Sequence, residues 1–444
     1  MAPRKPLSGL PAALAVAAAS GALVLASGNA PPMDDTYIHL VFGRSLLTPA
    51  PLSFNPGQPS SGFTSPLWLI PSAIASTAGD SAPAVLMILS SLCACAALLL
   101  AGGSAWPALL TGPFLFHASS GMETALACLF VALIWRSLAV PPSRLRDGML
   151  IAGALLARPE LAVLAPLVLT RHRKNGTGGM ALVLAPAAAV VSLWIAWNLH
   201  SAGRPLPSTF YAKQAASPPA LEELTSLAWR LAASAPLAIP AAAAGVLLLA
   251  RRGRPGFLAA PLLLAAALAT QPNPWFQLRY YVPALFAAGL TASAWLDGMA
   301  QRIRRIARPV LLVSSLPALA WFAGLRLQAS EDVEHIDILP ARFVASAAGP
   351  CDVAAAADIG AIGWMTGLEI LDLDGLVTPE RLPGSGRAGW RWLSERADWL
   401  VAFPDQYAGL LEEAGGRAVF EAGFRSPASV ICGSDSVAVW RIAD

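Results

Sequence analysis

The apolar and polar positions divide the chain into long hydrophobic runs separated by short polar loops. Runs of spanning or near-spanning length lie at 7–27, 82–101, 104–118, 121–139, 179–199, 233–250, 257–270, 280–297 and 308–325. A helix needs about 20 apolar residues to cross a bilayer. Shorter runs lie at 66–78 and on either side of Arg158-Pro159-Glu160. The pattern predicts a polytopic α-helical membrane protein with about nine full spans plus re-entrant or interfacial helices.

Basic clusters between these runs predict the orientation, because Lys and Arg favour cytoplasmic loops. The clusters are Arg4/Lys5, Arg136/Arg144/Arg146, Arg171/Arg173/Lys174, Arg251/Arg252/Arg254 and Arg302/Arg304/Arg305/Arg308. They place the loop 29–65 and everything after Arg326 outside, provided that 66–78 does not cross. The stretch 148–170 begins and ends beside basic clusters. It therefore predicts two half-helices that meet at Pro159, where proline breaks the helix ladder.

The residues after 326 have a different composition. Residues 327–444 hold 8 Lys/Arg and 18 Asp/Glu, a net charge of −10, whereas residues 1–326 hold 22 and 9, a net of +13. Short strands are predicted at Asp352–Ala357, Glu369–Asp372, Trp399–Phe403, Arg417–Phe420 and Val437–Ile442. Helices are predicted at Ile336–Ala345, Ala388–Arg396 and Gln406–Glu413. Alternating strands and helices predict a soluble extracytoplasmic α/β domain over 327–444 beside a membrane domain over 1–326.

Composition excludes several other classes. The chain is 56% hydrophobic and only 13% charged, with a mean hydropathy of +0.58. Its basic residues lie in short clusters between apolar runs, so they do not indicate nucleic-acid binding. Residues 1–30 resemble a signal peptide, but the many later spans favour an uncleaved first helix. Cys351 and Cys432 could form a disulfide if the tail is extracytoplasmic; their spacing does not decide this.

An acidic pair, Asp34 and Asp35, opens the first polar loop. Charge at the edge of hydrocarbon is costly and marks functional candidates. Adjacent carboxylates disfavour joint ionisation, so one can have a raised pKa and act as a general base. A hydrated interfacial pair, or acids at a helix N-terminus, are the structural alternatives. The same loop supplies further candidate cavity residues, namely His39, Arg44, Asn55, Thr64 and Trp68. His39 could bind a divalent ion with the carboxylates, but a structural hydrogen bond is favoured, and no metal site is predicted.

Other charged and aromatic residues open spans or follow them on the predicted outer side. Glu123 begins one span, and a first-turn acid is its structural alternative. Arg279 is the best candidate ligand for a donor phosphate, because its planar fork matches phosphate oxygens. Lys213, Arg204 and Tyr281 are expected to assist it, with lipid-headgroup contact as the alternative for the two cations. Arg158, Glu160 and Tyr211 complete the candidate cavity.

Several of these stretches together resemble one known family. They are Asp34-Asp35-Thr36-Tyr37-Ile38, Asn55-Pro56-Gly57, Thr64-Ser65-Pro66-Leu67-Trp68, Gly121-Met122-Glu123-Thr124, Arg158-Pro159-Glu160, Pro207-Ser208-Thr209-Phe210-Tyr211-Ala212-Lys213, Arg279-Tyr280-Tyr281-Val282-Pro283, Asp358-Ile359-Gly360-Ala361-Ile362-Gly363 and Asp372-Leu373-Asp374-Gly375-Leu376-Val377. Their order is similar to that in GT-C superfamily membrane glycosyltransferases, in the group around the terminal arabinofuranosyltransferase of the mycobacterial cell wall. Ser208 stands where this pattern has Asn.

The resemblance implies the activity. It implies an inverting transfer of a sugar from a polyprenyl-phosphate donor to a hydroxyl of an acceptor glycan or glycolipid, with Asp34 or Asp35 as base. The active site would lie on the outer face of the cytoplasmic membrane. A phosphodiester is already a good leaving group, so no cofactor is predicted. The sugar, the acceptor and the polyprenyl length stay open.

Two other functions remain open from the sequence. One is a transporter or flippase of lipid-linked sugars, which would suit Arg158 and Glu160 at membrane depth. The chain shows no repeated halves, which argues against it. The other is a non-catalytic subunit that holds lipid-linked glycans. The tail after 326 is expected to bind the acceptor glycan or to cap the cavity.

Overall fold

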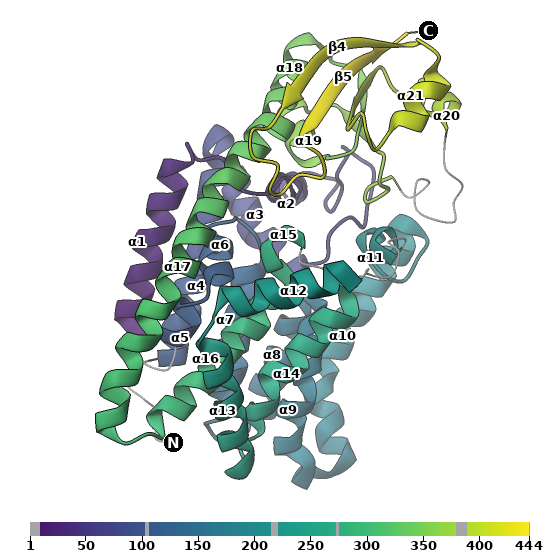
Figure 1. The fold of residues 1–444 in the computed structure, drawn as a ribbon. Coiled ribbons are helices and arrows are strands. Elements are labelled where there is room, and N and C mark those ends of the chain that lie inside the picture. The colour runs from purple at the N-terminus through teal and green to yellow at the C-terminus, as the bar shows by residue number, and fades with distance from the viewer. Residues whose placement is uncertain (1–8, 103–105, 215–220, 272–274, 379–388, 444) are drawn as a thin grey trace. The chain divides into compact units, whose positions relative to one another are not determined.

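The computed structural model describes residues 9–102, 106–214, 221–271, 275–378 and 389–443 (Figure 1). By its contacts the chain divides into two compact units. Unit 1 comprises Met1–Leu25, Met87–Ser192 and Pro219–Arg326, and unit 2 comprises Ala26–Leu86, Leu193–Pro218 and Leu327–Asp444. The predicted division into 1–326 and 327–444 stays a prediction.

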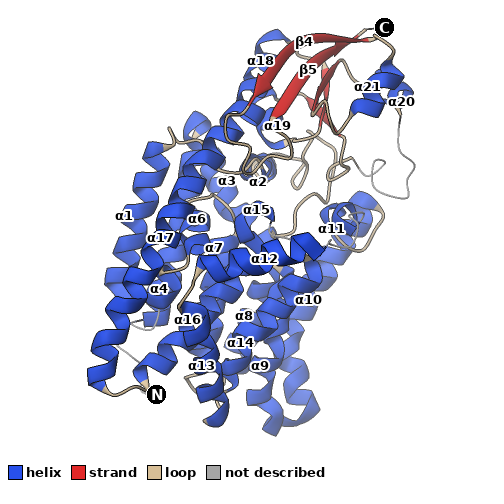
Figure 2. Cartoon of the chain, viewed as in Figure 1, coloured by secondary structure: helices blue, strands red, loops and turns tan. Residues whose placement is uncertain are grey.

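Unit 1 is built from helices, most of them at the positions that the apolar runs predict (Figure 2). They are α1 (Leu10–Ala26), α4 (Ala82–Ala101), α5 (Trp106–Leu109), α6 (Gly112–Ala118), α7 (Thr124–Ser137), α8 (Arg144–Ala157), α9 (Ala165–Leu169), α10 (Gly176–Ala202), α12 (Leu221–Ser234), α13 (Ala238–Arg251), α14 (Ala259–Thr270), α15 (Trp275–Leu278), α16 (Val282–Asp297) and α17 (Gln301–Val333). Helices α12 and α15 are the exceptions to the predicted positions, because they lie in stretches predicted as loops. Helices α4, α10 and α17 continue into unit 2.

Close helix contact in unit 1 depends on small side chains. A Cβ at Gly245 of α13 would overlap the backbone carbonyl of Thr291 on α16, and one at Gly289 of α16 would overlap Ala108 of α5. Small residues at such crossings let helix backbones approach closely, as is usual for helices in membranes. Phe114 of α6 stacks on Phe286 of α16 with ring centroids 5.5 Å apart. The core of unit 1 therefore lies where α16 meets α5, α6 and α13.

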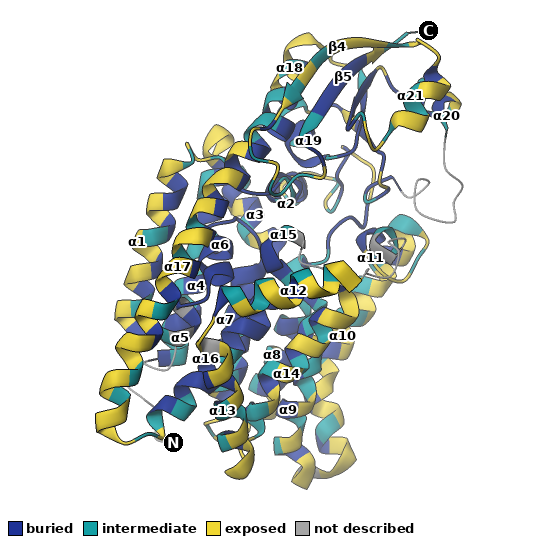
Figure 3. Ribbon diagram, viewed as in Figure 1, coloured by how far each residue is buried: buried dark blue, intermediate teal, exposed yellow. Residues whose placement is uncertain are grey.

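Three helices within the described residues are long and apolar enough to cross a membrane: Gly79–Ala101, Gly176–Ala202 and Gln301–Ala347. The bent pair Leu221–Ser234 and Ile239–Arg251 would make a fourth. Large apolar side chains such as Leu193 and Val313 are exposed on them, and exposed residues run along α1, α10 and α17 (Figure 3). Such apolar outer faces indicate a membrane location. The predicted count of nine spans is not confirmed.

Two predicted runs form broken helices. The run 104–118, expected as one span, is divided into α5 and α6, because Leu110 and Thr111 interrupt the helix and Pro113 opens the next one. The break predicted at Pro159 is present: α8 ends at Ala157, Arg158 is extended (φ −159°, ψ 130°), and a 3₁₀ turn, Pro159–Leu164, leads into α9. Pro159 is tolerated at the start of that turn, where its missing N–H has no partner to lose.

Unit 2 contains a five-stranded sheet in the order β2-β1-β3-β5-β4. The strands are β1 (Val353–Ala356), β2 (Glu369–Asp372), β3 (Trp399–Ala402), β4 (Ala418–Arg425) and β5 (Ser436–Ile442). Strand β1 pairs in parallel with β2 and β3, and β5 pairs antiparallel with β3 and β4. Helices α18 (Leu339–Ala347), α19 (Gly360–Thr366), α20 (Trp390–Ser394) and α21 (Ala408–Ala414) accompany the sheet. The predicted α/β arrangement of the tail is confirmed.

The loop 29–65, predicted to be the first outer loop, also belongs to unit 2. It contributes α2 (Asp35–Ser45), and it is followed by the short helix Pro66–Trp68 and by α3 (Leu69–Ser76). The interfacial or re-entrant placement of 66–78 stays a prediction. The loop's Ser61 Oγ lies 2.9 Å from Ser208 Oγ of α11 (Ser208–Gln214). The loop is thus joined to both later segments of the unit. Cys351 and Cys432 are both free, so the candidate disulfide is not formed.

Candidate active site

Asp34 of the first outer loop caps the N-terminus of α19 in the C-terminal domain. The Gly360 N–H donates to Asp34 Oδ2 and the Ala361 N–H donates to Oδ1, each over 2.6 Å. A helix N-terminus offers unpaired N–H groups and a partial positive charge, so it suits a carboxylate. A Cβ at position 360 would overlap the Asp34 carboxyl group. The first turn of α19 can therefore approach the Asp34 carboxyl group only because residue 360 is glycine.

Two further carboxyl groups surround Asp34. Burial, opposed by the two backbone N–H groups and assisted by the charge of Asp35, raises the pKa of Asp34 to about 7. Burial and the nearby Asp34 raise the pKa of Asp358 well above its usual range. Asp358 hydrogen-bonds Asp337, which is itself 6% exposed. The sequence reasoning did not select Asp337 or Asp358, although the Asp-Ile-Gly segment pointed to the second.

The remaining residues of the acidic pair's helix are largely buried. Asp35 is the first residue of α2 and is half-buried, like Asp34. His39 follows one turn later and is 6% exposed. A Cβ at Gly43 would overlap the backbone of Ser72, so α2 lies closely against α3. The helix is therefore held at its start by α19 and near its end by α3.

Asn55 joins the first outer loop to the edge of the sheet. Its Nδ2 donates to the Ile370 carbonyl and its Oδ1 accepts from the Ile370 N–H, both over 2.9 Å. The side-chain amide thus imitates a neighbouring strand beside β2. Thr64 is half-buried, and Trp68 is fully buried. These positions favour structural roles for Asn55 and Trp68 over direct contact with a substrate.

Replacement of Asn55 by Ala is expected to destabilise unit 2 by about 1–3 kcal/mol, because the buried N–H and C=O of Ile370 lose their partners. Hydrogen exchange at the Ile370 amide should become faster. Gln58→Ala is the control, because its hydrogen bond to Glu369 is exposed and contributes little. Unchanged protection of Ile370 in Asn55→Ala would contradict the strand-like role of the amide.

Two predicted donor ligands lie on the segment before and within α11. The guanidinium carbon of Arg204 lies 4.9 Å from the centroid of the Tyr211 ring. Both side chains are half-buried. Lys213 is also a residue of α11, but its side chain lies outside the described part of the chain. The structure thus brings Arg204 and Tyr211 together by a cation–π contact.

Four charged residues of unit 1 form a buried ion network. Glu123 Oε1 accepts from Arg158 over 3.0 Å and from Arg279 over 2.8 Å, and Arg279 also reaches Oε2 over 3.0 Å. Arg158 binds Glu160 with a second nitrogen over 2.9 Å. Arg158 also lies over the Tyr280 ring, 4.6 Å from its centroid. The network holds two arginines and two glutamates, so its formal charges cancel.

An unusual backbone turn presents Arg279 to this network. Phe276, Gln277 and Leu278 all have positive φ, at 53°, 51° and 63°. Successive left-handed residues other than glycine are costly and persist where the surroundings hold them, often at functional sites. The buried His117 Nε2 lies 3.1 Å from the Gln277 carbonyl and anchors the turn. The apolar pattern gave no signal for this turn.

Tyr281 follows Arg279 but is fully buried. Its hydroxyl donates to the Gln271 carbonyl over 2.7 Å. The hydroxyl therefore ties the turn to the end of α14, and in this state it does not offer its proton to a phosphate. The convergence of Glu123, Lys213 and Arg279 with the acidic pair stays a prediction.

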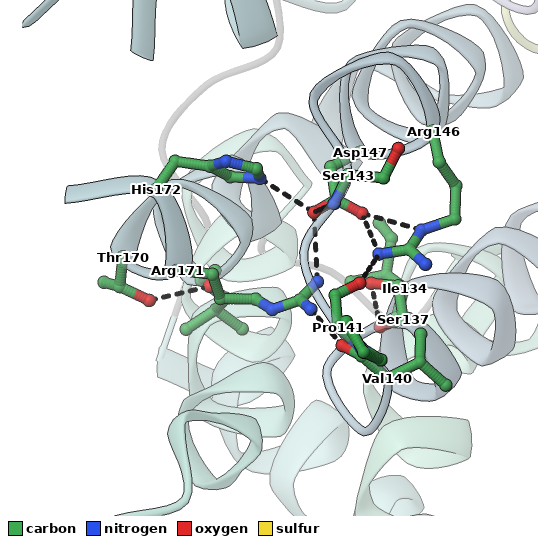
Figure 4. A network of polar contacts seen from close by, with 11 residues as sticks. Ile134, Ser137, Val140, Pro141, Ser143, Arg146, Asp147, Thr170, Arg171 and His172 are labelled. Carbon is green, nitrogen blue, oxygen red and sulfur yellow. Dashed lines mark hydrogen bonds and ion pairs between the residues drawn. The ribbon is translucent and has the colours of Figure 1, made fainter. Parts of the chain in front are cut away.

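A third polar network lies at an end of α8 that is predicted to be cytoplasmic (Figure 4). The fully buried Asp147 pairs with Arg146 over 2.8 Å, with Arg171 over 3.0 Å and with His172 over 2.8 Å. Arg146 also donates to the Pro141 carbonyl over 2.8 Å. Asp147 thus pairs with Arg146 and Arg171, which the sequence analysis used only to predict the orientation of the chain in the membrane. These contacts connect the 138–143 loop to the 170–175 turn.

Within the described ranges, no group of three or more His, Cys, Asp and Glu side chains is placed to hold a metal ion. Asp34 has a fixed orientation and a pKa near neutrality, which are the properties of a general base.

Comparison with known proteins bears on the fold. Residues 328–440 match a family model described as a domain of unknown function (DUF8728). No curated protein sequence matches the chain. Similar solved structures include ArnT from Cupriavidus metallidurans in the apo state, at 14% identity and a TM-score of 0.53, over 91% of this chain and 93% of ArnT. A second is the same protein bound to undecaprenyl phosphate, at 12% identity and a TM-score of 0.57, over 98% and 97%.

The chain shares the fold of ArnT. The likeness covers nearly the whole of both chains, so it includes the membrane helices and the C-terminal sheet domain. The finer resemblance to the arabinofuranosyltransferase group stays a prediction.

Proposed function

We propose that this protein is an inverting glycosyltransferase. It transfers a sugar from a polyprenyl-phosphate donor to a hydroxyl of an acceptor glycan or lipid, on the outer face of the cytoplasmic membrane. The observation that carries the proposal is the Asp34 carboxyl group, held by two N–H groups of α19 with a pKa raised to about 7. The shared fold with ArnT, a GT-C glycosyltransferase, supports it.

The reaction requires one proton transfer and one displacement. The acceptor oxygen attacks the anomeric carbon of the sugar while its proton moves to an oxygen of Asp34. The bond between that carbon and the phosphate oxygen breaks, and polyprenyl phosphate leaves with the electron pair. Attack opposite to the leaving group inverts the anomeric centre. Asp35 raises the pKa of Asp34 and so makes it a stronger base.

The donor phosphate requires cations. One solved structure of the same fold is bound to undecaprenyl phosphate, which supports a lipid phosphate as ligand. Arg279 remains our principal candidate, with Arg204, Lys213 and Tyr281 assisting. Because Arg279 already pairs with Glu123, a phosphate bound there must share or replace that carboxylate. Donor binding at Arg279 is thus proposed to rearrange the buried ion network.

The lipid that co-purifies with an inactive variant tests the proposal. Asp34→Asn/Asp35→Asn protein, extracted and examined by mass spectrometry, should carry a polyprenyl-phosphate sugar, whose mass identifies the sugar and chain length. Wild-type protein in proteoliposomes should convert that lipid to polyprenyl phosphate and a glycosylated product. Movement of the lipid across the bilayer without a glycosylated product would favour a flippase instead.

The activity should depend on pH through Asp34. A base must be unprotonated, so kcat/KM should fall as pH drops below the pKa of about 7 for Asp34. Asp35→Asn removes a charge that raises the pKa of Asp34, so the fall of kcat/KM on the acidic side of the pH–rate profile should move to lower pH. Rates measured between about pH 5 and 9 check this. A limb that stays in place or moves upward in Asp35→Asn would contradict the assignment of Asp34.

A further inference from the structure

A cavity of about 310 Å³ lies in unit 2 beside the C-terminal end of α2. Its wall comes from the end of α2, the following loop and the end of α19. The lining includes Arg44, Ser45, Thr48, Pro49, Phe54 and Gly363. The volume is at the lower end of the range for small-molecule sites, so the cavity suits a group of about one sugar ring.

Arg44 is an exposed residue that lines this cavity and supplies its cation. Within the described residues no carboxylate pairs with it, in contrast to Arg158 and Arg279. Its guanidinium carbon lies 4.7 Å from the centroid of the Trp364 ring, and one nitrogen donates to the Gly363 carbonyl over 3.4 Å. These two contacts hold the plane of the guanidinium and leave other N–H groups for a ligand.

Three hydroxyl groups of the cavity wall already donate hydrogen bonds to backbone carbonyls. Ser45 donates to the Phe42 carbonyl over 2.7 Å, Thr48 donates to the Ser45 carbonyl over 2.8 Å, and Ser53 donates to the Ala50 carbonyl. Their oxygens can therefore only accept. Arg44 is left as the side chain that can donate strongly, which selects a ligand with a negative group. The hydroxyl acceptors and the proline faces suit the ring and hydroxyls of a sugar.

The cavity shares a helix with the acidic pair. Asp35 and Arg44 are nine residues apart on α2, which corresponds to about 13 Å along the helix axis. A substrate that spans this distance could present a hydroxyl to Asp34 and an anionic group to Arg44. Because α2 is held by α19 and α3, the distance between the two positions is fixed.

We propose that the Arg44 cavity binds an anionic group of the acceptor, a sugar carboxylate or phosphate that lies several units from the reacting hydroxyl. The proposal rests on the function proposed above. The acidic domain, with a net charge of −10 over 327–444, repels anions in general. An arginine that no described carboxylate pairs with, in a partly open cavity, then makes binding depend on where the acceptor carries its charge.

Binding to the full-length protein in detergent tests the proposal without any transfer reaction. The probes are D-glucuronate for a carboxylate, glucose 6-phosphate for a phosphate and glucose as the neutral reference, each titrated by calorimetry or saturation-transfer NMR. At least one anionic sugar should bind about tenfold to a hundredfold more tightly than glucose, the range for a hydrogen bond to a charged group. The preferred probe identifies the anion.

Three variants test whether the preference for an anionic sugar depends on the Arg44 cavity. Arg44→Gln should remove the preference by loss of charge, and Thr48→Trp should remove it by filling the cavity while Arg44 is kept. Arg391→Gln is the matched control, because Arg391 is a highly exposed arginine of the same unit, with its side chain 93% exposed. Equal binding of the three sugars, or a preference that survives both Arg44→Gln and Thr48→Trp, would overturn the proposal.

Transfer from the co-purified donor lipid, measured on the same preparations, separates the two proposals. Transfer without any anion preference overturns only the cavity assignment. An Arg44-dependent preference in protein that never transfers sugar overturns the glycosyltransferase proposal, and with it the role of the anion as part of an acceptor.

Discussion

Replacement of Asp34 by Asn is expected to lower the rate of sugar transfer by about 10²–10⁴-fold, the usual contribution of a positioned general base. Asn keeps the shape of the side chain but cannot take the proton of the acceptor hydroxyl. Binding of the donor lipid should persist, because the donor ligands are proposed on other residues. The expected loss is therefore in kcat, measured in proteoliposomes with the co-purified lipid as donor.

Two controls separate catalysis from folding. Asn at position 34 can accept from only one of the Gly360 and Ala361 N–H groups, so docking of α19 should weaken by about 1–3 kcal/mol. Gly360→Ala disturbs the same contact but keeps the carboxylate, so it should lower the stability while its loss of transfer stays smaller than that of Asp34→Asn. Asp80→Asn changes an exposed carboxylate of unit 2 and should have no effect. Full activity in Asp34→Asn would refute the base assignment.

The element positions could be predicted from hydrophobic periodicity. Most helices of unit 1 overlap the apolar runs, and the strands of the tail overlap the expected positions. Helix α12 was missed, because its stretch was predicted as a loop. The break at Pro159 followed from one residue with a known effect on helices. The division of 104–118 into α5 and α6 could not be foreseen, because Leu110 and Thr111 are compatible with a helix and only tertiary packing interrupts it.

The partners within the candidate site could not be predicted. Asp34 and Gly360 are 326 residues apart, and no local pattern shows that a carboxylate meets the first turn of α19. The sequence placed Asn55 in a substrate cavity, whereas its amide binds the edge of β2. A polar side chain near a motif has the same sequence signal whether it binds a ligand or the backbone. Arg44 lines a cavity in the structure, whereas its role in binding a substrate stays a prediction.

The buried ion network of unit 1 shows a second limit of sequence reasoning. Arg279 was selected as a ligand for a donor phosphate, and the sequence did not show that it pairs with Glu123 in the structure. Charges at membrane depth must be compensated because water is absent there. The partners come from α7, the break after α8 and the turn before α16, so their pairing follows from the assembled helices and not from any one segment.

Replacement of Glu123 by Gln is therefore expected to destabilise the protein by about 3–5 kcal/mol, the usual cost of removing one partner from a buried ion pair. The network then holds Arg158, Arg279 and Glu160, so one positive charge is left buried. The apparent Tm in detergent should fall on the order of 5–10 °C, given the usual relation between stability and Tm. Glu160→Gln should cost less, since the Glu160 side chain is 19% exposed and pairs with one arginine, Arg158, among the described residues.

A second substitution distinguishes this charge effect from a loss of packing. Glu123→Gln/Arg279→Gln restores neutrality, with Arg158 and Glu160 still paired, so it should recover part of the lost Tm even though it removes a second set of hydrogen bonds. Arg279→Gln alone leaves the network with one excess negative charge and should be destabilised like Glu123→Gln. If the double variant loses as much stability as the two single variants together, the destabilisation does not come from a buried uncompensated charge.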